Sequence, residues 1–256
     1  MEERLTILRS FIYLVYLILS VLFFGSAIVV VGRFLSYRRR SRLAQLWAKS
    51  NLGALRLTCG LGYRVSGWEL LPATNAIVLC KHQSAWETIA LRALLPVEQT
   101  WVLKKELLRL PLFGAALNSF SPIAIDRAAG MMGMKRLLKD GKKSLTSGKW
   151  VIVFPEGTRV RSGERRAYNI GGAVLAERSG YPVVPIAHNA GMFWGRQSIL
   201  KRPGKIDLVI GPEIVTQGKA ASQINREAED WIESTTSALE RKGLTGGPRN
   251  PGSPPP

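Results

Sequence analysis

An apolar segment near the N-terminus constrains what this chain can fold into more than any other feature. It runs from Ser10 to Gly32, reads SFIYLVYLILSVLFFGSAIVVVG, and contains no charged residue over 23 positions. A helix of this length is about 34 Å long, enough to cross a hydrocarbon core of roughly 30 Å. The segment is too long for the apolar part of a signal peptide, no A-x-A-like cleavage site follows it, and buried core helices are rarely apolar on all sides. It therefore predicts a membrane helix over residues 10–32.

Basic residues flank this segment, and most of them follow it. They are Arg4 and Arg9 before it, and Arg33, Arg38, Arg39, Arg40, Arg42 and Lys49 after it. If the helix spans the membrane, this bias places the C-terminal body in the cytoplasm. If it lies within one leaflet, the same arginines suit anionic headgroups. The next stretch, residues 43–65, has apolar residues at helical spacing, which predicts a second helix either at the membrane interface or against the core.

The chain is strongly basic, with 36 Lys and Arg residues against 18 Asp and Glu residues and a formal net charge of +18. This excess favours an anionic partner, such as a phosphate ligand, an acidic membrane surface or a nucleic acid. A nucleic acid is the least favoured, because no aromatic stacking pattern accompanies the basic residues. The two cysteines, Cys59 and Cys80, have no neighbours at metal-ligand spacing. We therefore expect no zinc site, and a reduced cytosolic compartment.

The rest of the chain alternates strand-like and helix-like runs. The strand-like runs are 75–81, 121–127, 149–155, 181–190 and 205–214, and the helix-like runs are 85–95, 133–148, 171–180 and 221–242. Residues 100–108 read as a strand that enters a helix. This alternation predicts an α/β fold with a partly parallel sheet flanked by helices. We expect three regions: a membrane-anchoring helical region over 1–62, an α/β domain over 63–241, and a Gly/Pro-rich disordered tail over 242–256.

The first strand-like run leads into the sequence HQSAWE, residues 82–87. His82 lies where the strand ends, the position that often carries function in such sheets. Ser84 and Glu87 match the capping box S-x-x-E, which explains both residues without any chemistry but leaves His82 unexplained. The alternative is a catalytic base, His82, oriented by Glu87. Because no G-x-S-x-G nucleophile is present, such a base would have to activate a hydroxyl of the substrate.

A second cluster, FPEGTR, ends the strand-like run 149–155. Gly157 allows a sharp turn, and Thr158 and Arg159 can donate hydrogen bonds to a phosphate. A plain Pro/Gly turn with a solvated arginine is the simpler interpretation. Charged pairs stand at two further strand ends: Asp126-Arg127 and Lys104-Lys105. Together, a base and several cations at strand ends suit a phosphorylated alcohol and an anionic carrier.

Four short blocks occur in the order HQSAWE, IDR, FPEGTR and VVPIAHNA. In this order they resemble the sequence blocks of the 1-acyl-sn-glycerol-3-phosphate acyltransferases, and KKELLRLPLFG and the apolar N-terminus are similar to bacterial members. The resemblance implies a glycerolipid acyltransferase-like α/β fold. It also implies transfer of an acyl group from acyl-CoA or acyl-[acyl carrier protein] to the sn-2 hydroxyl of lysophosphatidic acid. The product would be phosphatidic acid, made for phospholipid biosynthesis at the cytoplasmic face of the bacterial inner membrane.

The resemblance further implies roles for individual residues. His82 would be the general base and Glu87 its orienter. The residues expected to bind the glycerol phosphate are Arg127, Glu156, Gly157, Thr158 and Arg159, with Lys104 or Lys105. Pro185 and its strand would line the acyl side. Beyond the acyl donor as co-substrate we expect no cofactor and no metal, and the expected partners are membrane lipids and the two substrates rather than a nucleic acid.

Two residues depart from the family pattern. Glu87 stands where the family usually has Asp. Asn169 stands where many relatives carry Lys, so one cationic contact is lost unless Arg165 or Arg166 replaces it. Two other functions stay open from the sequence: an acyltransferase for another lysolipid, such as lyso-ornithine lipid, and a membrane-anchored binding protein without catalysis.

Overall fold

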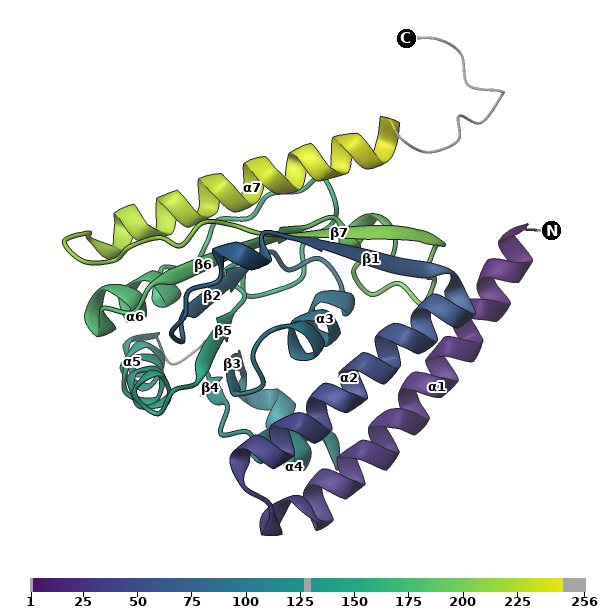
Figure 1. The fold of residues 1–256 in the computed structure, drawn as a ribbon, viewed down its shortest axis with the longest axis horizontal. Coiled ribbons are helices and arrows are strands. Elements are labelled where there is room, and N and C mark those ends of the chain that lie inside the picture. Colours follow the sequence, from purple (N-terminus) through teal and green to yellow (C-terminus); the bar gives the residue numbers. More distant parts are fainter. Residues whose placement is uncertain (1, 127–129, 246–256) are drawn as a thin grey trace.

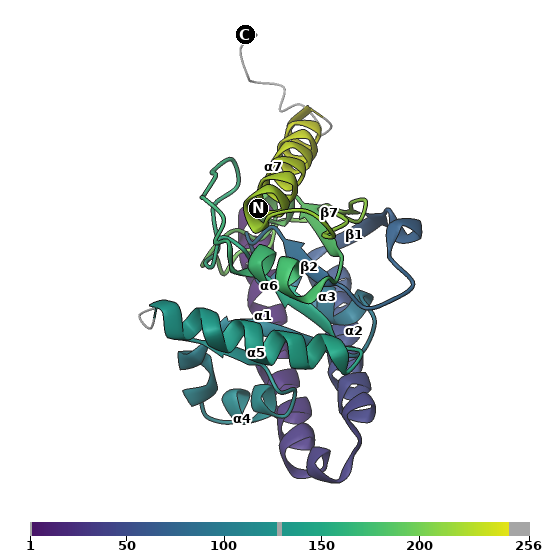
Figure 2. The ribbon, with the colours of Figure 1, turned by 90° about the vertical axis from the view of Figure 1, so that its left-hand side faces the viewer.

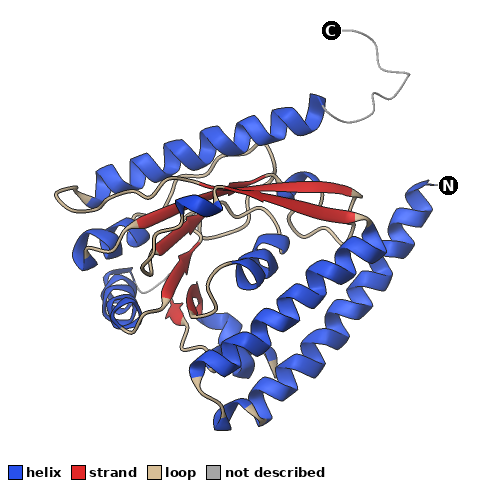
Figure 3. Ribbon diagram, in the orientation of Figure 1, coloured by secondary structure: helices blue, strands red, loops and turns tan. Residues whose placement is uncertain are grey.

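A seven-stranded sheet forms the centre of the molecule (Figures 1 and 3). The computed structural model describes residues 2–126 and 130–245. The strands are β1 Leu61–Ser66, β2 Ile77–Cys80, β3 Gln99–Lys104, β4 Ile123–Ile125, β5 Trp150–Val153, β6 Val183–His188 and β7 Gly204–Ile210. They lie in the order β1-β7-β6-β2-β5-β3-β4, in which β6 and β7 run antiparallel and the other described neighbours run parallel. The predicted α/β fold with a partly parallel sheet is confirmed.

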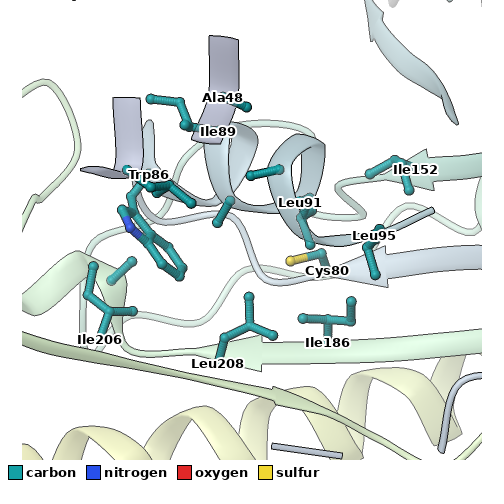
Figure 4. Close-up of a cluster of buried hydrophobic side chains, with 14 of the residues drawn as sticks. Ala48, Cys80, Trp86, Ile89, Leu91, Leu95, Ile152, Ile186, Ile206 and Leu208 are labelled. Atoms are coloured by element: carbon teal, nitrogen blue, oxygen red, sulfur yellow. The ribbon is translucent and has the colours of Figure 1, made fainter. Parts of the chain in front are cut away.

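Alternate strand residues point to opposite faces of the sheet, and each face has its own hydrophobic cluster. On β2, Val78 and Cys80 belong to one cluster, and Ile77 and Leu79 belong to the other. All four side chains are fully buried. Figure 4 shows the first cluster, in which Cys80 lies among apolar side chains from strands and helices. Burial on both faces explains why this strand reads as a continuous apolar run in the sequence.

Helices cover both faces of the sheet (Figures 1 and 2). On the first face lie α1 Glu2–Val30, α2 Tyr37–Cys59 and α3 Trp86–Leu94. On the second face lie α5 Gly130–Thr146, α6 Gly171–Ser179 and α7 Ala221–Thr245. The shorter elements are η1 Gly32–Phe34, η2 Trp68–Leu70, η3 Lys105–Arg109, α4 Phe113–Asn118 and η5 Ala190–Met192. The helix expected over residues 10–32 is present as α1, but it begins earlier, at Glu2.

The first two helices form a hairpin in which α2 also packs against α3 (Figure 1). A polar contact fixes the hairpin, because Ser20 Oγ accepts hydrogen bonds from Trp47 Nε1 and Asn51 Nδ2, each at 3.1 Å. Lys201 N donates to Ser10 Oγ at 2.9 Å, which ties α1 to the segment before β7. α1 is long and apolar enough to cross a membrane, and 22% of its most apolar window is buried inside the protein. Most of its apolar surface therefore faces outwards.

The structure differs from the predicted boundaries of the three regions at two points. Leu61 and Gly62 belong to β1 and pair with β7, so the sheet begins just inside the region predicted to be helical. α7 continues to Thr245, so residues 242–245 are helical rather than part of a disordered tail. Residues 246–256 of that predicted tail lie outside the described residues. The division into an anchoring region and an α/β domain stays a prediction.

Candidate active site

The carboxyl ends of β2 and β5 lie side by side, because these two strands are parallel neighbours. The HQSAWE segment follows β2, and the FPEGTR turn follows β5. Two hydrogen bonds join them: Val160 N donates to the His82 carbonyl at 2.8 Å, and His82 N donates to Glu156 Oε2 at 3.0 Å. Two clusters that are distant in the sequence therefore form one site at the ends of strands, the usual place for ligand sites in α/β sheets.

His82 and Glu87 form a hydrogen-bonded pair. His82 Nδ1 lies 2.8 Å from Glu87 Oε1, and the imidazole stacks on Phe154 with ring centroids 4.0 Å apart and planes 13° apart. The Glu87 side chain is fully buried, whereas 14% of the His82 side chain is exposed. With Nδ1–H donated to the carboxylate, Nε2 keeps a free lone pair. This is the arrangement of a histidine base that is held in place by an acid.

The Glu87 carboxylate also holds the start of α3. Its Oε1 accepts hydrogen bonds from the backbone N–H of Gln83 at 2.9 Å and of Ser84 at 2.8 Å. Ser84 Oγ accepts from Trp86 N at 3.1 Å rather than from the Glu87 amide. The hydrogen bond from Ser84 N to Glu87 is the one that the predicted capping box requires, but the helix begins at Trp86, so Ala85 rather than Ser84 is its N-cap. Glu87 thus fixes the backbone that leads into α3 and contacts His82 at the same time.

Glu87 is held as a carboxylate despite its burial. Burial by itself raises the pKa of this group, but the imidazoles of His188 and His82 and the hydrogen bonds from His82 and Ser84 bring the pKa below its usual value. His188 ends β6 and is fully buried, and burial lowers its pKa. Its Nε2 lies 3.8 Å from Glu87 Oε2 and donates to the Lys81 carbonyl at 2.9 Å. His188 was not predicted as a site residue, although it lies in the VVPIAHNA block.

A buried ion network lies next to His82. Lys81 Nζ lies 3.0 Å from Glu156 Oε1 and 2.7 Å from Glu233 Oε1, and none of the three side chains is more than 4% exposed. Glu156 Oε1 accepts no hydrogen bond from the described residues, so its contact with Lys81 is electrostatic. Burial raises the pKa of Glu156 to about 7, an effect that Lys81 opposes. Glu156 is expected to contact the glycerol phosphate, but in this structure its carboxyl group faces Lys81 and the His82 amide.

The rest of FPEGTR forms an accessible turn. Gly157 has a φ of 68°, which glycine adopts without strain, and its N–H donates to the Phe154 carbonyl at 2.9 Å. Thr158 and Arg159 are half-buried. Arg159 Nε is buried and has no hydrogen-bond partner in the described part of the chain. The turn thus carries a hydroxyl and a guanidinium whose Nε is buried and unpaired among the described residues.

Asn169 stabilises the backbone at the start of this turn. Its backbone N and its Nδ2 both donate to the Pro155 carbonyl, at 2.9 and 2.8 Å. The residue that stands where many relatives carry Lys therefore fixes the backbone instead of supplying charge. Arg165 and Arg166, its suggested replacements, are exposed, and Arg165 Nε lies 3.8 Å from Glu233 Oε2.

The remaining predicted residues lie at different depths. Lys104 ends β3 and Lys105 begins η3, and both side chains are exposed. Pro185 is buried in β6, in register with Leu79 of β2. Arg127 lies outside the described residues. The structure therefore brings His82, Glu87 and the FPEGTR turn together, while the contacts expected of the other residues with substrate stay predictions.

Known proteins match the segment that holds this site. A family model described as Acyltransferase matches residues 62–189. A 1-acyl-sn-glycerol-3-phosphate acyltransferase of Pseudomonas aeruginosa is 38% identical over 237 residues, which cover 91% of each chain. A protein with the same name from Helicobacter pylori is 28% identical and covers 63% of this chain and 66% of its own. A crystal structure of the 1-acyl-sn-glycerophosphate acyltransferase PlsC from Thermotoga maritima has a TM-score of 0.71 at 19% identity, over 91% of this chain and 98% of that one, which shows a shared fold.

The raised pKa of Glu156 predicts a specific pH dependence of stability. The folded protein binds this proton more tightly than the unfolded chain, so the contribution of Glu156 to the free energy of unfolding falls as the pH rises from about 4.5 to about 7. Glu156→Gln lacks this dependence, so over that interval the variant should gain about 1–3 kcal/mol relative to the unchanged protein. Urea unfolding of both proteins in detergent, at several pH values across the interval, measures the difference. A difference that does not change with pH contradicts the prediction.

Proposed function

The chain belongs to the acyltransferase family, and on this basis we propose that it acylates the free hydroxyl of 1-acyl-sn-glycerol-3-phosphate to form phosphatidic acid. The names of its relatives support this acceptor. The observation that carries the proposal is the His82–Glu87 pair beside the FPEGTR turn, because it places a general base next to hydrogen-bond donors for a phosphate. The proposed donor is the thioester of acyl-CoA or of acyl carrier protein.

In the proposed reaction, His82 Nε2 removes the proton of the acceptor hydroxyl. The hydroxyl oxygen attacks the carbonyl carbon of the thioester, so that a C–O bond forms and the C–S bond breaks. The leaving thiolate takes the proton that His82 carries, which restores the neutral imidazole. Glu87 stabilises the imidazolium between these two transfers, and the stacked ring of Phe154 fixes the plane of the imidazole.

The acceptor phosphate is proposed to bind at the FPEGTR turn. Thr158 offers a hydroxyl, and Arg159 offers a guanidinium whose Nε has no partner among the described residues. Gly157 carries no side chain, so the phosphate can approach the backbone closely. Lys104 and Lys105 add positive charge from the end of β3. We leave Glu156 out of this set, because its carboxyl group is buried against Lys81 and the His82 amide.

We also propose that the outward face of α1 inserts into the membrane that holds the lipid acceptor. Its exposed apolar side chains include Leu8, Phe11, Ile12, Ile18, Leu19, Leu22 and Phe23. The cations of α2, which packs along α1, are Arg38, Arg39, Arg40, Arg42, Lys49 and Arg56. If α1 crossed the whole bilayer, it would carry these cations into the hydrocarbon at a cost of about 2.5–3.5 kcal/mol each. Insertion into one leaflet avoids this cost and leaves the α/β domain at the cytoplasmic face, where both donors are present.

Catalysis by His82 is tested with the purified protein in detergent, lysophosphatidic acid, and either acyl-CoA or acyl carrier protein thioester. The unchanged protein should form phosphatidic acid, and His82→Ala should lower kcat by about 10²–10⁴-fold, since the general base is lost. Lyso-ornithine lipid, which has no phosphate, should be a poor acceptor. Failure of the unchanged protein to acylate any lysolipid would refute the proposed function, and full turnover by His82→Ala would refute the base.

Glu87→Gln separates the capping role from the orienting role of this residue. Glutamine keeps an oxygen that can accept from the Gln83 and Ser84 amides, so the thermal midpoint of unfolding should change little. It removes the negative charge that stabilises the His82 imidazolium, so kcat should fall by about 10²–10⁴-fold. Midpoint and kcat are measured on the same preparation. If kcat is retained, Glu87 is a cap and the orienting role is wrong.

Membrane attachment through α1 is tested with Ile18→Asp combined with Leu22→Asp. Both side chains are exposed and lie one helical turn apart, at 52% and 49% exposure. Each charge opposes burial in hydrocarbon, so binding to vesicles that contain anionic lipid should weaken at least about tenfold in a co-sedimentation assay. The matched control is Val215→Asp, at an exposed apolar position outside the helical hairpin, with 56% exposure. Equal binding by all three proteins would show that α1 is not the anchor.

A further inference from the structure

Both chain neighbours of His82 are held by carboxylates of α7. Lys81 Nζ lies 2.7 Å from Glu233 Oε1, and Gln83 Nε2 donates to Glu240 Oε1 at 2.8 Å. Glu233 and Glu240 are seven residues apart, so they lie on the same face of the helix. One face of α7 therefore contacts the residue before His82 and the residue after it.

Glu240 also binds the segment that follows the FPEGTR turn. Residues 159–166, here called the basic loop, contain Arg159, Arg161, Arg165 and Arg166. Ser162 Oγ donates to Glu240 Oε1 at 2.7 Å, and Gly163 N donates to Glu240 Oε2 at 3.1 Å. A single carboxylate thus joins the basic loop to Gln83, which in turn accepts a hydrogen bond from Gly191 N at 3.2 Å.

Glu233 makes a parallel set of contacts closer to the core. Besides Lys81, it accepts a hydrogen bond from the Tyr168 hydroxyl at 2.9 Å and lies 3.8 Å from Arg165 Nε. Lys81 Nζ also donates to the Glu164 carbonyl at 3.5 Å. The two glutamates, Glu233 buried and Glu240 half-buried, therefore fix the position of the HQSAWE segment relative to the basic loop.

These contacts differ from those that pack the helix. The first half of α7 is fixed by buried apolar side chains, Ile224, Ala228 and Ile232, which belong to the cluster on the second face of the sheet. Glu240 is only half-buried, and it accepts hydrogen bonds from Gln83, Ser162 and Gly163, which belong to the two segments that form the site. Loss of a half-buried side chain of this kind changes overall stability little, whereas it removes the hydrogen bonds that set the position of the basic loop.

We propose that Glu240 is a positioning residue, which sets the distance between His82 and the cations of the basic loop and hence between the base and the acceptor phosphate. This inference rests on the proposed acyl transfer to a phosphate-bearing lysolipid. It goes beyond that proposal because it makes the second half of α7 part of the catalytic apparatus. Loss of Glu240 frees the basic loop, which weakens binding of the acceptor phosphate and misaligns the hydroxyl with His82.

The test compares the unchanged protein with Glu240→Ala, Glu240→Gln and the control Glu227→Ala. Glu227 is a second carboxylate of α7, but it pairs with Lys219 at 2.6 Å, away from the site segments. For Glu240→Ala, the KM for lysophosphatidic acid should rise about tenfold with a lower kcat, because two segments lose their shared acceptor. The KM for the acyl donor and the midpoint of unfolding should stay close to those of the unchanged protein. Glu240→Gln, which keeps one acceptor oxygen, should be intermediate, and Glu227→Ala should resemble the unchanged protein.

Two further measurements separate positioning from a general structural role. Adding Ser162→Ala to Glu240→Ala should cause little further loss, because both changes remove the same contact. Amide hydrogen exchange of the basic loop should be faster in Glu240→Ala than in Glu227→Ala, a readout that needs no activity.

The outcomes distinguish this inference from the proposed function. If the unchanged protein transfers acyl groups to lysophosphatidic acid but Glu240→Ala keeps its KM and kcat, the positioning role is wrong and the acyltransferase stands. Equal losses in Glu240→Ala and Glu227→Ala also overturn it, since they would mean that α7 acts only through stability. If the unchanged protein acylates no lysolipid, the proposed function fails and this inference fails with it.

Discussion

The arrangement of the site depends on one buried charge, the ammonium of Lys81. An ammonium removed from water is costly unless it is paired, and two carboxylates lie within 3.0 Å of it. Glu156 comes from the turn after β5, and Glu233 comes from α7. Pairing the Lys81 ammonium therefore requires the end of β2, this turn and α7 to lie next to one another. Because His82 follows Lys81 directly, these contacts also determine where the imidazole lies. The position of His82 is thus a consequence of how a buried charge is paired.

Glu87 shows how one side chain can serve folding and chemistry together. It accepts hydrogen bonds from the backbone that begins α3 and contacts the His82 imidazole with the same carboxylate. The longer side chain of glutamate reaches back over Gln83 and Ser84 and still meets Nδ1 at 2.8 Å. The replacement of the usual aspartate is therefore compatible with an oriented histidine. His188, buried behind the pair, adds a second imidazole to the surroundings of Glu87.

Structural features that depend on residues adjacent in the sequence could be predicted. The uncharged segment predicted α1, and the apolar run before His82 predicted β2. Pro155 and Gly157 together indicated the turn at Gly157. Contacts set by strand order could not be predicted in this way. His188 meets the Lys81 carbonyl across 107 residues because β6 lies beside β2, and Glu240 meets Gln83 across 157 residues because α7 lies over the second face. Neither periodicity nor motif spacing records such separations, so the contact between Glu156 and Lys81 could not be predicted either.

The order of these contacts along the chain matters while the protein is being synthesised. The ribosome makes α1 before the strands of the sheet, so its apolar surface is present early in translation, whereas Glu233 is made 152 residues after Lys81. Until α7 has emerged and docked, Lys81 lacks one of its two carboxylates and the HQSAWE segment lacks its outer support. Domains generally fold as units as they emerge. The apolar face of α1 is therefore made before the surroundings of His82 are complete, because α7 supplies carboxylates to both neighbours of this residue.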